Sequence, residues 1–319
     1  MNPRQKPSMT EQAGEDGSIF GGNLAAAGRA IIADARKALC DPKLSDPEAV
    51  HNLRKALKRW RAYLRLLERP LGAPARAMRV EAREMMRALA GARDAQSALD
   101  ALDDLSKSET PPAKTSVATL RGRLTDIRDA AEAATFTAET RERLARYLDY
   151  AALSLERWPV AEIDFDAIAD GLAVTYRRAR GLVPENWAQA DPEHLHDLRR
   201  RVVEHRHQME LIEPLWPREG KAWAQKAQRL RNRLGACQDL EMLRQFTGPH
   251  QPLARWRARL APAIAARRAA HLHEAARLTA RLFADKPKAF RKRIAALRPA
   301  RKTARPRKTP APVRSSSER

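Results

Sequence analysis

An internal repeat constrains the fold of this chain more than any other feature of its sequence. Shifting the first half by 145 residues, without a gap, places Asp46-Pro47-Glu48 on Asp191-Pro192-Glu193. The same shift aligns these further pairs: His51 with His196, Leu53 with Leu198, Arg54 with Arg199, Arg61 with Arg206, Leu66 with Leu211, Leu89 with Leu234, and Asp94 with Asp239. Separate landmarks that share one offset predict two copies of one unit, packed about a pseudo-twofold axis.

Each copy has the pattern of a helical unit. Apolar residues recur at helical spacing, and strand-like alternation is not evident. Ala, Leu and Arg dominate and only 5% of the residues are aromatic, which favours helix over sheet. Breaks rich in Pro, Gly, Asp or Ser fall at 42–47, 70–74, 109–112, 157–159, 181–192, 213–220 and 248–252. We therefore predict an all-α protein with about eight or more helices of roughly 10–25 residues.

The two ends of the chain lack this pattern. Residues 1–17 are polar, and residues 298–319 mix Pro, Ser and Thr with basic residues. Both segments are predicted to be disordered. The expected folded domain spans 18–297, with one repeat over about 18–157 and the other over about 158–297.

The charge balance points to a polyanionic partner. Lys and Arg number 61 against 39 Asp and Glu, giving +22 and a pI near 10.9. Nucleic acid, anionic lipid and phosphate polymers all fit such a charge. The tail 298–319 carries a net +7, so the remaining chain carries +15. The tail nevertheless leaves open a nonspecific DNA-binding, nucleoid-associated function.

Several other classes of protein are not expected from this sequence. Cys40 and Cys237 lack CxxC spacing, so a disulfide framework or zinc ribbon is not predicted and a reducing, cytoplasmic setting fits. The chain has no secretory signal pattern and no apolar run approaching about 18 residues, so neither secretion nor a membrane span is expected. Without a P-loop, GxGxxG, GxSxG or paired-carboxylate motif, we predict no enzyme activity and no cofactor.

Two helices with one apolar and one basic face are predicted after the repeated Pro-Glu. Ser45 or Asp46, and then Asp191, are suitable N-caps, and proline follows at the first helical position. At about 100° per residue, the expected binding residues share one face of each helix. They are His51, Arg54, Lys55, Lys58, Arg61 and Arg65 in the first copy, and His196, Arg199, Arg200, Arg206 and His207 in the second. Trp60 and His205 are predicted on the apolar sides.

This basic face indicates an anion-binding surface. From His51 to Leu67 the sequence contains no acidic residue, and each like-charged i,i+3 or i,i+4 pair costs about 0.2–0.5 kcal/mol. Arg offers a bidentate fork, Lys a point charge and His a ring donor, all suited to phosphate. Two such helices make a surface longer than one phosphate ester, so the expected ligand is a linear polymer.

Further residues are assigned by their positions near these helices. Asp94 and Asp239 are expected to orient the arginines rather than act as bases. Additional candidates for the groove wall are Arg36, Lys37, Arg93, Arg177, Arg178, Lys226, Arg229 and Arg233. The histidines of the HLH and HRH segments are two residues apart and point about 160° from one another, so no metal site is predicted.

The repeated motif resembles a known family. His51-x-x-Arg54-Lys55-x-x-Lys58-Arg59, its echo His196-x-x-Arg199-Arg200, and the segments LAGARD and LGACQD are similar to the conserved histidine α-helical domain, CHAD. Over about residues 18–297, this resemblance implies two pseudo-symmetric four-helix-bundle repeats forming one domain with a basic central groove. It further implies binding of inorganic polyphosphate and association with polyphosphate granules. Weak nonspecific nucleic-acid binding is a secondary expectation.

Overall fold

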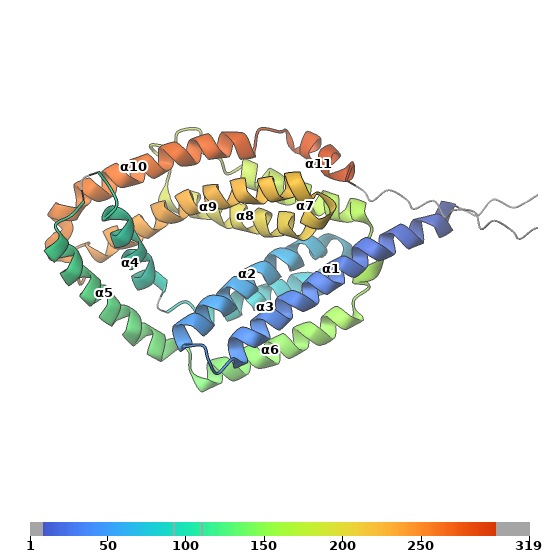
Figure 1. Ribbon diagram of the computed structural model, residues 1–319, viewed down its shortest axis with the longest axis horizontal. Coiled ribbons are helices and arrows are strands. Elements are labelled where there is room, and N and C mark those ends of the chain that lie inside the picture. The colour runs from blue at the N-terminus through green and yellow to red at the C-terminus, as the bar shows by residue number, and fades with distance from the viewer. Residues whose placement is uncertain (1–8, 92, 110, 298–319) are drawn as a thin grey trace, which may run out of the picture.

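The computed structural model describes residues 9–91, 93–109 and 111–297, and every regular element in them is a helix (Figure 1). The helices are α1 (Met9–Cys40), α2 (Asp46–Leu71), α3 (Ala73–Ala88), α4 (Arg93–Leu105), α5 (Lys114–Thr135), α6 (Ala138–Arg157), α7 (Phe165–Arg180), α8 (Pro192–Ile212), α9 (Pro217–Phe246), α10 (Arg257–Leu282) and α11 (Pro287–Ala295). Three short 3-10 helices, Val160–Glu162, Glu213–Leu215 and Ala254–Trp256, join them. The all-α prediction is confirmed.

Helix boundaries follow the predicted breaks, and the structure has further interruptions between helices. Each of the seven predicted breaks lies at a junction between two successive described helices. Further interruptions lie at 89–92, 136–137 and 283–286, which the sequence interpretation missed. Helix α1 starts at Met9, inside the segment 1–17 predicted to be disordered, because a helix anchored by packing extends at little cost per residue. The predicted disorder of 1–8 and 298–319 lies outside the described residues.

The order of elements recurs at the sequence offset. Shifted by 145 residues, α2 falls on α8, α5 on α10, and α3 with α4 together on α9. The two copies differ at one place. The segment LAGARD interrupts the helix between α3 and α4, whereas LGACQD lies inside the continuous helix α9. The pseudo-twofold relation between the copies stays a prediction.

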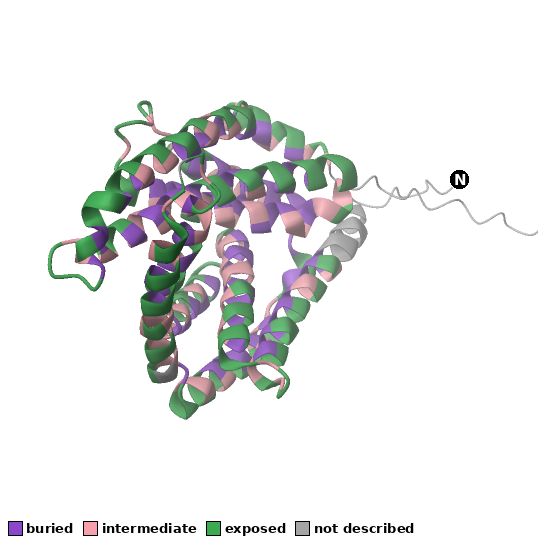
Figure 2. Ribbon diagram, turned by 60° about the vertical axis from the view of Figure 1, so that its left-hand side comes forward, coloured by how far each residue is buried: buried purple, intermediate pink, exposed green. Residues whose placement is uncertain are grey.

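The hydrophobic core has two parts, and they do not follow the repeats. The larger joins α1, α2, α3 and α6 to α7, α8, α11 and parts of α9 and α10. The smaller is formed by α4 and α5 together with the C-terminal half of α9 and the start of α10. Helices α4 and α5 of the first repeat therefore pack against helices of the second repeat. The two repeats, which meet near residue 157, do not have separate hydrophobic cores. In Figure 1 these two helices connect the upper and lower layers, and Figure 2 shows buried residues on the inward helix faces.

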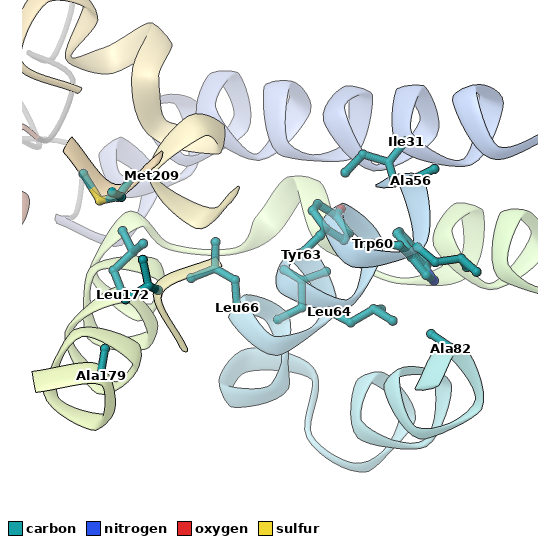
Figure 3. Packing of buried hydrophobic residues seen from close by; sticks show 14 of the residues in the cluster. Ile31, Ala56, Trp60, Tyr63, Leu64, Leu66, Ala82, Leu172, Ala179 and Met209 are labelled. Carbon is teal, nitrogen blue, oxygen red and sulfur yellow. The ribbon is translucent and has the colours of Figure 1, made fainter. Parts of the chain in front are cut away.

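Helix α2 is the central element of the larger core. Trp60 is 2% exposed, stacks on Tyr63 at 5.2 Å between ring centroids, and donates to the Tyr147 hydroxyl at 2.8 Å. Tyr147 in turn donates to the Met78 carbonyl at 3.1 Å, so one chain of contacts joins α2, α6 and α3. Figure 3 shows Leu66 of α2 among residues of α7 and α8. This packing fixes the rotation of α2 about its axis, and with it the direction of its basic face.

Candidate polyanion-binding cavity

The N-termini of α2 and α8 are fixed by capping groups. The Ser45 backbone N–H donates to Glu48 Oε2 at 3.0 Å and its hydroxyl to the same oxygen at 2.7 Å. Asp191 Oδ2 accepts from the His194 N–H at 3.0 Å. Pro47 and Pro192 stand at the start of the two helices. These caps satisfy donors that each helix leaves free.

The apolar faces of both helices are buried as predicted. In α2 the buried residues include Leu53, Leu57 and Trp60, and in α8 they include Leu198 and Val202. Because these faces occupy the common core, the basic faces turn toward the space that α2 and α3 share with α8 and α9 (Figure 1).

That space is a cavity of about 680 Å³, here called the basic cavity. Thirteen Arg or Lys residues, three His and a single carboxylate line its wall. The lining residues are His51, Arg54, Lys55, Lys58, Arg61, Ala62 and Arg65 of α2; Arg79, Arg83 and Met86 of α3; Arg93 of α4; His196, Arg199, Arg200, Arg201, Val203, Glu204, Arg206 and His207 of α8; and Arg231 of α9.

The eleven residues predicted from the two basic faces all line this cavity, and Arg93 joins them. The other residues predicted on the groove wall do not line the cavity, so their assignment was wrong. They are Arg36, Lys37, Arg177, Arg178, Lys226, Arg229 and Arg233. Arg36 pairs with Asp149 of α6 at 2.7 Å, and Arg233 contacts His271 of α10 at 3.3 Å. The others are exposed residues outside the lining. Their rotation about their helices depends on tertiary packing that no local pattern fixed.

Four cationic residues of the wall were missed: Arg79, Arg83, Arg201 and Arg231. Two signals could have found three of them. Arg79 and Arg83 are four residues apart on α3, so they share one side of the helix, next to the face that buries Met78 and Ala82. Arg231 occupies the position equivalent to Met86 at the offset of 145 residues, and both residues line the cavity.

The equivalent arginines Arg54 and Arg199 are held in different ways. Arg54 Nη1 donates to the carbonyls of Met86 at 3.0 Å and Leu89 at 2.8 Å, which the end of α3 leaves free. Arg199 Nη1 donates to Gln238 Oε1 at 2.7 Å. In the continuous helix α9 the corresponding carbonyls are used within the helix, so a side chain supplies the acceptor.

Asp94 and Asp239, predicted to orient these arginines, are not the groups that bond them. The described hydrogen-bond partners of Arg54 and Arg199 are the carbonyls and the amide named above. The two carboxylates act at longer range: burial lowers the pKa of Arg54 and of Arg199 to about 10, and Asp94 and Asp239 respectively oppose that shift.

Burial and the crowding of like charge lower the pKa of Lys58, one of the two lysines on the cavity wall. Burial lowers the pKa of Lys58 to about 7, and the charges of Arg54, Arg199, Arg231 and Arg93 add to the effect. Burial also lowers the pKa of Arg61 to about 10. A bound polyanion would relieve both effects, because it would supply the missing counter-charge.

Several nitrogen atoms on the wall are buried and have no hydrogen-bond partner among the described residues. They include Arg61 Nε, Arg199 Nε and His196 Nδ1. Buried donors without acceptors are rare in folded proteins because each costs about 1–3 kcal/mol. Their position on the wall of the basic cavity indicates a site built for an acceptor-rich ligand.

The other histidines of α8 differ in availability. His205 is fully buried, accepts from Trp223 Nε1 at 3.0 Å, and has its pKa lowered to about 3 by burial, which confirms its place in the core. His207 lines the cavity but is only 6% exposed and contacts Glu210 at 2.8 Å. Over the described chain, no group of three or more His, Cys, Asp or Glu side chains is placed to hold a metal ion.

A second cavity, of about 920 Å³, lies between the segment 187–192 and α10. Its wall is rich in alanine, and its arginines already have partners. Arg244 makes two hydrogen bonds to Glu241, and Arg268 donates to the Ala190 carbonyl at 3.0 Å. The basic cavity is therefore the candidate functional site, although it is the smaller of the two.

The fold and the cavity define an all-helical protein with an internal cationic site. A sequence model of the CHAD domain matches residues 24–248. The chain therefore belongs to the CHAD domain family. The crystal structure of the CHAD domain from the plant Ricinus communis is similar in fold, with a TM-score of 0.52 and 16% identity, covering 87% of this chain and 92% of that one.

Two other findings complete the comparison. A search of curated proteins found no match. Within the described residues, no helix combines the length and the apolar character needed to cross a bilayer.

Proposed function

We propose that the protein binds linear inorganic polyphosphate in the basic cavity and does not alter it chemically. One observation carries the proposal. Eight of the thirteen basic residues on the wall have no ion-pair partner among the described residues: Arg54, Lys55, Lys58, Arg61, Arg83, Arg93, Arg199 and Arg231. All of them except Lys55 and Arg83 are partly buried. Unpaired cations at this density and burial need an external anion of high charge.

The dimensions favour a chain over a single phosphate group. His51 and Arg65 are fourteen residues apart on α2, which corresponds to about 21 Å along the helix axis. A row of donors of this length matches repeated phosphates better than one ester. Family membership supports the same ligand class.

The absence of catalysis belongs to the proposal. The single carboxylate of the wall, Glu204, lies between Arg65 and Arg201, and these two cations already neutralise its charge, so it is poorly placed to act as a general base. Incubation with long-chain polyphosphate and Mg²⁺ or Mn²⁺ is expected to release no orthophosphate. Release that depends on the cavity residues would overturn this part.

The proposed location follows from the ligand. A cytoplasmic protein of this kind would associate with polyphosphate granules. A fluorescent fusion is expected to co-localise with stained granules and to become diffuse when polyphosphate synthesis is blocked.

The primary test is a competition titration with labelled long-chain polyphosphate at about 150 mM salt, where weak nonspecific contacts are screened. Unlabelled polyphosphate should compete far better than duplex DNA, RNA or orthophosphate at equal phosphate concentration. The double variant Arg54→Glu, Arg199→Glu is expected to lose at least about a hundredfold in affinity.

The matched control is Arg177→Glu, Arg178→Glu, which makes the same charge change on exposed residues outside the cavity. This control should bind nearly as the unmodified protein does. Equal competition by DNA, or equal losses in both double variants, would replace the proposal with general polyanion binding.

A further inference from the structure

Two carboxylates neutralise one end of the basic cavity. Glu204 of α8 lies 3.3 Å from Arg65 Nε and 3.0 Å from Arg201 Nη1. Glu68 of α2 pairs with Arg65 at 3.0 Å and with Arg79 of α3. The side chains of Glu204 and Glu68 are only 16% and 14% exposed. Five charged groups from three helices therefore form one ion-pair network there.

The other end of the cavity has no such network. His51, Arg54 and Lys58 lie toward the start of α2, and His196 and Arg199 toward the start of α8. In the described structure Arg54, Lys58 and Arg199 have no carboxylate within ion-pair distance, and of the wall cations beside them only Arg200 is paired, with Asp197 at 2.9 Å. Arg93 contributes a further positive charge to this end. Among the α2 residues that line the cavity, only Arg65, the last of them, is paired with acids.

The repeat shows that Glu204 is a local departure. At the offset of 145 residues, Val203 and Glu204 replace Lys58 and Arg59 of the first copy. The second copy thus has a carboxylate on the cavity wall at a position where the first copy has an arginine.

Glu204 accepts a hydrogen bond from Arg201 and forms an ion pair with Arg65 at 3.3 Å, so it neutralises charge that a phosphate would otherwise meet between them. A polyanion that extends toward Arg65 therefore meets cations that are already paired, and its own charge is repelled by Glu204. Because that network is half-buried, the repulsion is screened less than it would be in open solvent.

We propose that Glu204 acts as a stop in the basic cavity: it occupies the phosphate position between Arg65 and Arg201 and limits bound polyphosphate to the end lined by His51 and His196. This inference rests on the proposed function and adds a residue that determines how much of a chain is bound. Affinity should therefore rise with chain length and level off once the unpaired cations are occupied.

The test uses the full chain and size-fractionated inorganic polyphosphates, from tripolyphosphate upward. Glu204→Gln keeps the shape of the side chain and removes its charge. Its affinity is expected to match the unmodified protein for the shortest chains and to exceed it by about tenfold for long chains. The length at which affinity levels off should increase.

Two further variants make the result specific. Glu84→Gln removes the same charge from an exposed residue of α3 that pairs with Arg87, and it should leave the length profile unchanged. In the double variant Arg65→Gln, Glu204→Gln, the long-chain gain should disappear, because Arg65 would bind the additional phosphate. Circular dichroism and thermal unfolding would verify that each variant is folded.

The outcomes separate this inference from the proposed function. If the unmodified protein binds no polyphosphate, the proposed function fails. If it binds, but Glu204→Gln matches it at every length or strengthens binding equally at every length, the stop is wrong and the proposed function stands. A long-chain gain that persists in the double variant would also overturn the stop.

Discussion

Lys58 is the cavity side chain whose charge depends most on the ligand. Burial lowers its pKa to about 7, and the guanidinium groups of Arg54, Arg199, Arg231 and Arg93 oppose its protonation further. A lysine in water keeps its proton up to about pH 10. A polyanion in the cavity stabilises the protonated form, so binding near neutral pH takes up a proton.

This gives a pH-dependence with a defined sign. Polyphosphate affinity should fall by about tenfold between pH 6.5 and 8.5, because Lys58 loses its proton in the free protein over that range. Burial lowers the pKa of His196 below its ordinary value, so that histidine contributes mainly at lower pH. Lys58→Arg, which stays charged, should bind with little pH dependence over the same range. An equally steep profile in this variant would contradict the assignment.

The same shift affects folding. Because the folded-state pKa of Lys58 lies below its unfolded value, the folded protein binds fewer protons between about pH 7 and 10. Its contribution to the free energy of unfolding therefore increases with pH in that window. Below about pH 7 the penalty for burying the charge is fully present.

At the residue scale, the sequence predicted which side chains lie on the face of a helix opposite its own apolar face. His51, Arg54 and Lys58 were found because Leu53, Leu57 and Trp60 define the buried side locally. Arg233 was misplaced because its direction depends on how α9 meets α10. The role of Glu204 could not be foreseen, since its partner Arg65 is 139 residues away in sequence.

At the scale of elements, Asp104 fastens α4 of the first repeat to α10 of the second. Its carboxylate accepts two hydrogen bonds from Arg267, at 2.7 and 2.9 Å, and one from His271 Nε2 at 2.7 Å. Although burial opposes it, these hydrogen bonds lower the pKa of Asp104. The stabilisation is therefore present above the ordinary pKa of an aspartate and is lost as pH falls through the lowered value.

Replacing Asp104 by Asn should lower the free energy of unfolding by about 1–3 kcal/mol, since buried His271 loses a charged acceptor. Urea unfolding monitored by circular dichroism would measure the loss. Asp103→Asn is a matched control, because Asp103 pairs with Arg121 and both side chains are nearly half exposed. Its effect should stay below about 0.5 kcal/mol. Equal effects at the two positions would show that the buried contacts contribute little.

The helical class and most helix boundaries were predictable, but three interruptions and the packing of the helices were not. Proline, glycine and acidic clusters mark most helix ends, and these signals are local. The interruption after α3 contains Gly91, but LGACQD contains Gly235 and stays helical, so the glycine alone does not predict the break. Helices α4 and α5 pack against the second repeat through contacts between segments that are distant in sequence. Leu102 and Leu240, for example, belong to the same hydrophobic core.

For the whole molecule, the number of unpaired cations sets the salt dependence. If about eight phosphates are contacted, a slope of roughly −0.7 per contact predicts a loss of about three orders of magnitude in affinity between 50 and 200 mM salt. A titration series over that range measures the slope. Deleting 298–319, which carries a net +7, should change the slope little. If the deletion removes most of the binding, the tail and not the cavity is the main contact.

The two arginine anchors differ in how they respond to substitution. Arg54 is bonded by the carbonyls of Met86 and Leu89, which are present whatever side chains those positions carry. Arg199 depends on the amide of Gln238, which a single codon change can remove. At the equivalent position the first copy carries Arg93, which cannot accept a hydrogen bond. Substitutions in α3 therefore leave the acceptors of Arg54 in place. A single substitution at Gln238 removes the acceptor of Arg199, so evolution can change the position of this arginine more easily.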